Sequence, residues 1–420
     1  MERIKIGIFA SNVALLYLLS DIIPKNTTFS TLVYLLILLL AYYSFRLYDT
    51  EYLSSFKSQL FRTFIAGTID IVLFYFLDLI SEFTFSPRYV WFTLSASLSV
   101  SILNVVLFVG IKSLLKPQKY VIIGKQEEYS DIIDELTKNS GSMFSISGYV
   151  NPDLSQLRAL MQISNGVLIG NLKFAKTIEN DFNANYSNKQ IKYLPDFIEQ
   201  KLKRIPLNLI EKYEQYYILE FSKPKDTLEI RLLDIFVSIV AIILTSPLWL
   251  IIALAILIED GRPVIFKQKR AGKDGKLFTM YKFRSMRNLP QNDSQPKYPD
   301  QEKGRILKVG KIIRKYRLDE LPQLINVLKG DMSIVGPRPE QKELHEIYSH
   351  ADIPYYEYRL KVKPGITGWA QITYQYSSSV DEAAKKLEYD LWYVKNKNFW
   401  LNVKIIMKTP ETMLFRRGAK

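Results

Sequence analysis

Two adjacent carboxylates, Asp319 and Glu320, are the residues of this chain whose types and spacing best suit chemistry. A helix is predicted directly after them, because apolar residues recur there at helical spacing, at Leu321, Leu324, Ile325 and Leu328. The dipole of such a helix favours anions at its N-terminus and would keep Asp319 ionised and able to act as a nucleophile. The pair could also bind one Mg²⁺, with diphosphate oxygens completing its shell. From this segment alone, an N-capping aspartate on a plain surface helix is the alternative.

Several cations in the same half of the chain could neutralise phosphate charge. Arg314 lies five residues before Asp319. Lys282 and Arg284 lie near the end of a predicted strand, and Arg338 lies between two prolines in a stiff turn. Fixed cations of this kind hold phosphate groups. A basic strand end that is merely solvated is the alternative.

The composition narrows the chemistry further. The chain has 420 residues, no cysteine and only two histidines, which excludes disulfides, thiol catalysis and zinc sites built from cysteine. Acid–base or nucleophilic catalysis must therefore use carboxylates, hydroxyls, lysines or tyrosines. The formal net charge is +14, but the basic residues form no arm or repeat, so we expect no nucleic-acid partner. In a membrane protein, such an excess faces the cytoplasm and the anionic leaflet.

Four apolar segments in the N-terminal part are long enough to cross a bilayer, which takes about 20 residues. They are residues 4–23, 28–47, 60–80 and 89–111. Lysine and arginine gather before the first segment, between the second and third, and after the fourth, so the positive-inside rule places these parts in the cytoplasm. Polar residues within the last two segments serve either helix packing or function, and they are Asp70, Asp78 and Asn104.

A fifth apolar segment, residues 235–258, contains no charge. At about 1.5 Å per residue, its helix would be just long enough to span a bilayer. Pro247 interrupts it, however, and both of its flanks are basic. We therefore predict a re-entrant hairpin that dips into one leaflet and returns to the cytoplasm. The hydroxyl of Ser246 would satisfy a backbone group that Pro247 frees. A kinked fifth span is the alternative.

Between the fourth span and residue 200, short apolar runs alternate with polar helical stretches. This alternation predicts a small parallel sheet of Rossmann type. The turn at 124–127 lacks the glycine pattern that lets a backbone approach a pyrophosphate, so we interpret this domain as structural or regulatory, with nucleotide binding as the alternative. The predicted strands are 120–123, 146–150, 167–169 and 191–194, and the predicted helices are 129–138, 153–162 and 173–183.

The region after residue 260 has a mixed pattern of strands and helices. Residues 264–266 predict a strand that leads into a basic loop at 267–270, and further strands are predicted at 278–283 and 331–335. Residues 399–413 form an amphipathic tail rich in aromatic residues. The aromatic residues of the last two helical stretches form either an interfacial belt or part of the core, and they are Tyr389, Trp392, Tyr393 and Trp400.

The predicted fold class is a membrane protein that combines α-helices with α/β domains. Its predicted parts are four transmembrane helices (1–115), a Rossmann-like α/β domain without a dinucleotide fingerprint (116–200), a connector (201–230), a re-entrant membrane hairpin (231–260) and a cytoplasmic α/β catalytic domain (261–420).

Together these motifs resemble the bacterial sugar transferase family, the monotopic phosphoglycosyl transferases. The similarity covers about residues 225–420 in matching order. The N-terminal half resembles the long subgroup that starts exopolysaccharide, capsule or O-antigen assembly. The matching stretches include Thr-Ser-Pro at 245–247, Pro-Val-Ile-Phe at 263–266, Tyr-Lys-Phe-Arg-Ser-Met at 281–286, Leu-Asp-Glu-Leu-Pro-Gln at 318–323, Gly-Pro-Arg-Pro at 336–339, and residues 363–371 and 389–396.

The resemblance implies a two-step transfer of a sugar 1-phosphate from a UDP-sugar to polyprenyl (undecaprenyl) phosphate at the bacterial inner membrane. Asp319 would attack the β-phosphorus and release UMP, and the lipid phosphate would then attack the phosphosugar ester. Glu320 would assist Asp319 and Mg²⁺. Arg314 would steady phosphate. On a weaker match to the family, Lys282, Arg284 and Arg338 would do the same. Ser246 and Pro247 would anchor the active site at the membrane face.

The chain departs from many members at 372–375, where Ile-Thr-Tyr-Gln replaces an Asn-Gly-Arg run. That change puts any sugar specificity carried over from those members in doubt. Two other functions stay open. One is an inactive membrane scaffold or regulator of polysaccharide assembly, and the other is a nucleotide-sugar epimerase or dehydratase. The sugar, the polymer and the formation of a homo-oligomer are not determined by the sequence.

Overall fold

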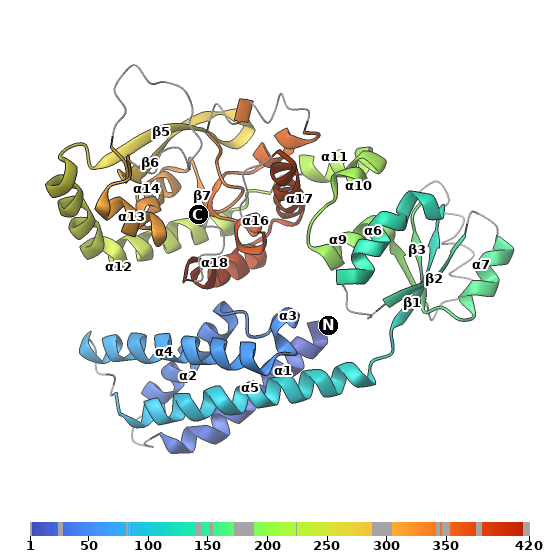
Figure 1. Cartoon of the computed structure of the whole chain (residues 1–420), viewed down its shortest axis with the longest axis horizontal. Helices are drawn as coiled ribbons and strands as arrows, with labels where there is room; N and C mark the ends of the chain where they lie inside the picture. Colours follow the sequence, from blue (N-terminus) through green and yellow to red (C-terminus); the bar gives the residue numbers. More distant parts are fainter. Residues whose placement is uncertain are drawn as a thin grey trace.

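The computed structural model describes residues 2–23, 28–80, 83, 85–139, 144–150, 154–171, 189–223, 225–287, 305–341, 345–346, 353–374 and 380–414. Figure 1 shows three regions: a bundle of long helices from the N-terminal part, an α/β region, and a larger region that contains the C-terminal half of the chain.

The bundle consists of α1 (Glu2–Leu19), α2 (Thr28–Ser44), α4 (Phe56–Ile80) and α5 (Arg88–Leu114), with the short α3 (Thr50–Leu53) between the second and third. Segments of three of these helices are long and apolar enough to cross a membrane: Arg3–Ile22, Phe56–Leu79 and Arg88–Leu114.

The second predicted span is shorter than the sequence suggested. Helix α2 has 17 residues and ends at Ser44, because the chain turns at Arg46, whose φ is +56°. At about 1.5 Å per residue it falls short of the roughly 30 Å of a hydrocarbon core.

Two of the polar residues in the predicted spans serve local packing. The side-chain amide of Asn104 donates to Gln59 (2.9 Å). The Asp78 carboxylate accepts a hydrogen bond from the backbone of Phe85 (3.1 Å). Asp70 is buried.

The predicted α/β region contains a four-stranded parallel sheet with the order β2-β1-β3-β4. Its strands are β1 (Gln118–Ile123), β2 (Phe144–Val150), β3 (Gly166–Ile169) and β4 (Gln190–Tyr193), accompanied by α6 (Gln126–Asn139) and α7 (Leu154–Met161). The helix predicted at 173–183 lies outside the described residues.

The turn after β1 is filled by a tyrosine. A Cβ added to Gly124 or to Gly170 would collide with the ring of Tyr129, whose hydroxyl lies 3.1 Å from that of Tyr213. Nucleotides bind such sheets at the carboxyl ends of the strands where the strand order reverses. In this sheet that position lies between β1 and β3, and the two tyrosines occupy it.

The segment predicted as a connector is packed into the core. It forms α10 (Leu207–Lys212) and α11 (Glu214–Ser222) after α9 (Leu194–Leu202). One hydrophobic cluster runs from Tyr120 in the sheet through Tyr217 to Ile405 near the C-terminus. The α/β region and the C-terminal region therefore share a continuous core.

Helix α12 (Leu228–Asp260) holds the fifth apolar segment in one 33-residue helix with Pro247 inside it. The helix turns partway along its length (Figure 1). The hydroxyl of Ser246 donates to the carbonyl of Ile243 (2.8 Å), which is the carbonyl that Pro247 leaves without its helical donor. This is the hydrogen bond expected of Ser246 from the sequence. Helix α12 is also long and apolar enough to cross a membrane, and its re-entry into one leaflet stays a prediction.

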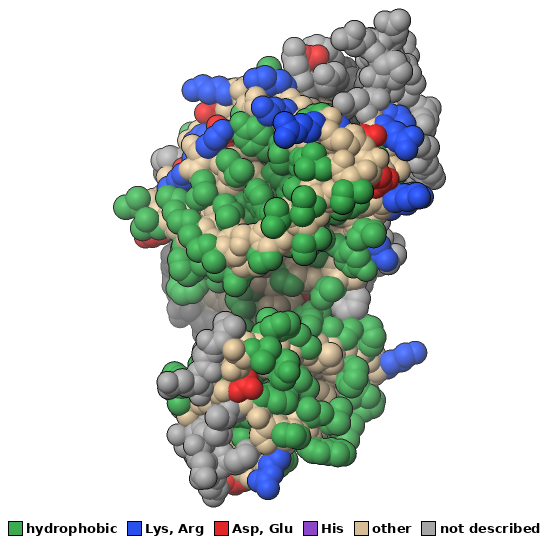
Figure 2. Space-filling view, turned by 90° about the vertical axis from the view of Figure 1, so that its left-hand side faces the viewer, with side chains coloured by type: hydrophobic (Ala, Val, Ile, Leu, Met, Phe, Trp, Pro, Cys, Tyr) green, Lys and Arg blue, Asp and Glu red, His purple; other side chains and the backbone are tan. Residues whose placement is uncertain are grey.

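Hydrophobic side chains cover much of one face of the molecule (Figure 2). Helix α12 exposes large apolar residues on both sides of Pro247, among them Phe236, Leu244, Leu250 and Ile258. Exposed apolar area of this extent marks an interaction surface, and a lipid bilayer is the surrounding that the composition of α12 suits.

The C-terminal region contains an antiparallel hairpin of β5 (Ile265–Ala271) and β6 (Leu277–Phe283), and a short parallel pair of β7 (Ser333–Val335) and β8 (Gly365–Thr367). The basic loop predicted at 267–270 was wrong, because these residues continue strand β5. The helices of this region are α13 (Lys308–Lys315), α14 (Gln323–Lys329), α16 (Trp369–Thr373), α17 (Val380–Asn396) and α18 (Phe399–Leu414). Trp392 and Tyr393 are buried, whereas Trp400 is 75% exposed.

Helix α18 docks on the bundle through buried charges. Glu411 pairs with Arg46 and Arg62 (2.9 Å each), and Lys408 pairs with Asp49 (2.6 Å). The sequence analysis did not predict this contact, because its partners lie about 350 residues apart.

Candidate active site

The loop between α13 and α14 places the two carboxylates in a short 3-10 turn, Leu318–Glu320. Arg317, just before the turn, has a φ of +55°, so the chain reverses sharply there. Asp319 is 9% exposed and Glu320 is 6% exposed. Helix α14 begins at Gln323, two residues later than predicted.

Helix α12 holds the outer ends of the two helices that flank this loop. The Glu259 carboxylate accepts hydrogen bonds from the backbone of Lys308 (2.6 Å) and Val309 (2.9 Å), the first residues of α13. The Arg231 guanidinium donates to the carbonyls of Val327 (2.6 Å) and Leu328 (2.7 Å), near the end of α14. Charges of these signs suit these helix ends. The membrane-type helix is therefore bonded to both helices that carry the carboxylate loop.

Glu320 is held by three cations. Its carboxylate lies 2.7 Å from Arg338, 3.4 Å from Lys282 and 3.7 Å from Arg317. Burial alone would raise the pKa of Glu320, but these cations hold the pKa well below its ordinary value. Glu320 therefore stays ionised and organises the cations around the loop.

The Asp319 carboxylate differs from that of Glu320 in its partners and in the direction of its pKa shift. Among the described residues, none of the hydrogen bonds or ion pairs involves its carboxylate. Burial raises the pKa of Asp319 above its ordinary value; Lys282 opposes that shift and the charge of Glu320 adds to it. Desolvation therefore outweighs the favourable charges in setting the direction of this pKa, and ionisation of Asp319 beside the helix stays a prediction. The result is a more basic carboxylate whose oxygens have no hydrogen bond or ion pair within the described residues.

The predicted phosphate-binding cations fall into two groups. Lys282 and Arg338 lie at the carboxylate pair, and Arg314 is near enough to act electrostatically on Asp319. Arg284 lies elsewhere: its guanidinium donates to the carbonyls of Asp260 (2.7 Å) and Gly261 (2.8 Å). Its position indicates that Arg284 holds the end of α12 rather than a substrate phosphate.

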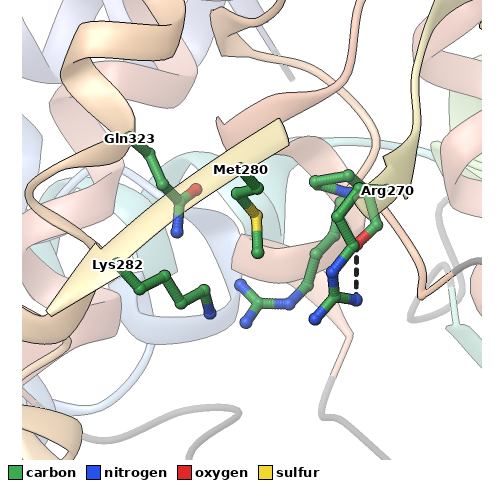
Figure 3. Close-up of a pocket in the computed structure, with 6 residues that line it drawn as sticks. Arg270, Met280, Lys282 and Gln323 are labelled. Atoms are coloured by element: carbon green, nitrogen blue, oxygen red, sulfur yellow. Dashed lines mark hydrogen bonds between the residues drawn. The ribbon is translucent and has the colours of Figure 1, made fainter. Parts of the chain in front are cut away.

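A small pocket adjoins the carboxylate loop (Figure 3). Its lining residues are Arg270, Met280, Lys282, Gln323, Arg338 and Pro339. The side chains of Lys282, Gln323 and Arg270 point toward one another across it. Three cations and an amide around one pocket suit an anionic ligand.

The sequence analysis did not single out Arg270 or Gln323. Arg270 could have been found from strand periodicity, since Gln268 opposes Met280 and Phe266 opposes Lys282 in the hairpin. Residues two apart on a strand share a face, so Arg270 and Lys282 point to the same side. Gln323 carried no comparable signal.

The site offers few oxygen ligands to a divalent cation. Within the described part of the chain, no group of three or more histidine, aspartate or glutamate residues could hold a metal ion. Within the described residues the carboxylate oxygens of Asp319 have no partner and could bind a hard cation, whereas those of Glu320 face arginine and lysine. Such a set suits Mg²⁺ when one or two carboxylates share it with substrate phosphates.

Comparison with known proteins identifies the class of this protein. The family model described as bacterial sugar transferase matches residues 226–416. The sugar transferase EpsL of Bacillus subtilis is 43% identical over 191 residues, which is 45% of this chain and 89% of EpsL. The chain therefore belongs to the bacterial sugar transferase family.

Two relatives carry specific descriptions. A UDP-N-acetylgalactosamine-undecaprenyl-phosphate N-acetylgalactosaminephosphotransferase of Aeromonas hydrophila is 46% identical over 191 residues, which is 45% of this chain and 44% of that protein. A UDP-glucose:undecaprenyl-phosphate glucose-1-phosphate transferase of Escherichia coli is 43% identical over 178 residues, which is 42% of this chain and 38% of that protein. The match thus covers less than half of either protein.

Proposed function

We propose that this protein transfers a sugar 1-phosphate from a UDP-sugar to undecaprenyl phosphate, as the first membrane step of polysaccharide synthesis. The observation that carries the proposal is the asymmetry of the carboxylate pair. Glu320 forms the ion pairs, while the nearly buried Asp319, near Lys282 and Arg338, has no ion pair or hydrogen bond within the described residues. A basic carboxylate among cations suits attack on a phosphorus atom whose oxygens are negatively charged.

The proposed reaction has two steps. In the first, an oxygen of Asp319 bonds to the β-phosphorus, the bond from that phosphorus to the bridging oxygen breaks, and UMP leaves with the electron pair. In the second, an oxygen of undecaprenyl phosphate bonds to the same phosphorus and Asp319 leaves as a carboxylate. The product is an undecaprenyl diphosphate sugar. A covalent intermediate lets a soluble donor and a lipid acceptor react in turn.

The surrounding residues have defined parts in this proposal. Lys282 and Arg338 would neutralise the phosphate oxygens, and Arg314 would add to the local positive potential. Mg²⁺, which neutralises diphosphate charge, would be bound by Asp319 together with donor oxygens, and Glu320 would orient the cations. Arg284 has no part in binding the donor.

The proposed location is the bacterial inner membrane, with the catalytic region in the cytoplasm, where UDP-sugars are made. The apolar helices of the bundle and the exposed apolar face of α12 support this arrangement. The bent α12, whose two ends are bonded to α13 and α14, would hold the carboxylate loop at the membrane face. A lipid phosphate can reach the loop there.

The proposal is tested with the full-length protein in membranes, supplied with undecaprenyl phosphate and each of UDP-glucose, UDP-galactose and UDP-N-acetylgalactosamine. Release of UMP that requires Mg²⁺ and a phosphosugar mass on the peptide containing Asp319 would support it. Asp331→Asn, a change just after α14, is the matched control for Asp319→Asn. The absence of UMP with every donor, or a phosphosugar adduct on another residue, would contradict the proposed function.

The two alternative functions, an inactive scaffold and an epimerase or dehydratase, are judged by different observations. An inactive scaffold predicts that Asp319→Asn leaves polysaccharide assembly intact, so the same variant decides it. An epimerase or dehydratase would need a nucleotide at the sheet, but Tyr129 and Tyr213 fill the position between β1 and β3.

A further inference from the structure

The turn that presents Arg338 has an unusual set of hydrogen bonds. Two of its four residues are prolines, which lack a backbone N–H, so the turn has few donors of its own. Three successive carbonyls accept from other parts of the chain instead: Pro337 from the backbone of Gly365 (3.0 Å), Arg338 from Arg359 (2.8 Å) and Pro339 from Arg270 (3.2 Å).

Arg359 is the buried member of this set. It lies in the 3-10 segment Tyr356–Lys361 and is 3% exposed. Its guanidinium donates to Asp390 (3.1 and 3.3 Å) and to the Tyr356 hydroxyl (3.0 Å), as well as to the Arg338 carbonyl. The guanidinium is thus bonded on several sides at once, which fixes its orientation.

Arg359 is buried and, among the described residues, does not line the pocket. The lining includes Arg338 and Arg270 but not Arg359. Burial of Arg359 with Asp390 would be explained by stability alone if the guanidinium had only carboxylate partners. The hydrogen bond to the Arg338 carbonyl links it to the active site, because the side chain of Arg338 reaches Glu320.

We infer that Arg359 is a positioning residue that acts through Arg338. This inference rests on the proposed function of Arg338. Asp390 and Tyr356 fix Arg359, Arg359 fixes the carbonyl of Arg338, and the side chain of Arg338 is thereby aimed at Glu320 and the donor phosphates. Lysine cannot replace Arg359, because one ammonium cannot reproduce a planar fork bonded to a carboxylate, a hydroxyl and a carbonyl.

The test compares Arg359→Lys with Arg204→Lys in the full-length protein. Arg204 is a matched control, since it is also 3% exposed and pairs with two carboxylates, Glu388 and Glu135, as Arg359 pairs with Asp390 and Glu340. We expect Arg359→Lys to lower kcat by about tenfold to a hundredfold, the scale of a misplaced catalytic group. Its KM for undecaprenyl phosphate should stay unchanged, and Arg204→Lys should keep kcat within about threefold.

A second comparison separates positioning from general destabilisation. In an Arg338→Ala background, Arg359→Lys should lower kcat by less than about twofold, because groups that act as one unit are not additive. Equal losses in both backgrounds, or an equal loss in Arg204→Lys, would overturn the inference. Tyr356→Phe removes only one hydrogen bond of Arg359 and serves if Arg359→Lys does not fold; its smaller loss must also vanish in the Arg338→Ala background.

Failure of the proposed function looks different from failure of this inference. If the wild-type protein releases no UMP, the proposed reaction fails. If the wild type is active and Arg359→Lys behaves as Arg204→Lys does, only the positioning role fails.

Discussion

The active-site charges and the charges that dock α18 on the bundle are of the same residue types, and they differ in how the carboxylates are paired. At the docking contact, the carboxylate of Glu411 faces two arginines and Lys408 faces Asp49. At the active site, three cations converge on Glu320, while Asp319 has no ion pair in the part of the chain that the structure describes. Buried ion pairs that engage every carboxylate specify how two surfaces meet, whereas a carboxylate without an ion pair beside several cations suits the binding of an anion.

The largest expected effect comes from the free carboxylate. Asp319→Asn keeps the shape of the side chain but removes the nucleophilic oxygen, so UMP release should fall by at least about a thousandfold. Thermal melting should change little, because no hydrogen bond of the described residues is lost. A variant that retains transfer would show that the active-site cluster is structural, like the docking cluster.

The docking cluster should respond in the opposite way. Glu411→Gln leaves Arg46 and Arg62 buried without their carboxylate, and we expect a loss of about 3–5 kcal/mol in the free energy of unfolding. Turnover per folded molecule should be unchanged. The measurements are thermal melting and UMP release normalised to folded protein, with the exposed Glu211→Gln as control. Lost turnover with intact stability would mean that the two clusters are not separate in function.

The pH dependence of turnover tests the raised pKa of Asp319. Because the ionised form is the nucleophile, turnover should fall as the pH drops through a pKa above the ordinary aspartate value. Lys282 opposes the raised pKa, so Lys282→Met should move the acidic limb to higher pH. A limb that moves to lower pH would contradict the assigned charges.

The smallest expected effect concerns the membrane helix. Ser246→Ala removes the hydrogen bond to the Ile243 carbonyl and should cost about 1 kcal/mol of stability. Ser95→Ala, which removes the equivalent hydrogen bond to the Phe92 carbonyl (2.8 Å) in α5, is the control, because no proline affects that carbonyl. An equal loss of stability from both changes would show that the hydrogen bond of Ser246 is no more important beside Pro247 than the same bond is in a helix without proline.

Sequence periodicity and motif order were enough to predict much of the fold. Alternating apolar runs predicted the four strands of the parallel sheet, and the Asp319-Glu320 pair was found from its place before an amphipathic stretch. These features are local, because strand and helix spacing are written in neighbouring residues. Boundaries were less secure: the second span is shorter than predicted, and β5 continues through the expected basic loop.

What the sequence determined by itself is which residue types lie close along the chain: two carboxylates, a proline after a serine, and an arginine between prolines. Only the tertiary structure decided which cations reach Glu320, that Arg284 holds α12, and that Arg359 and Glu411 find partners far away in sequence. The physical reason is that burial and pairing depend on contacts between distant segments. Those contacts set both the charge state of a carboxylate and the direction of a guanidinium.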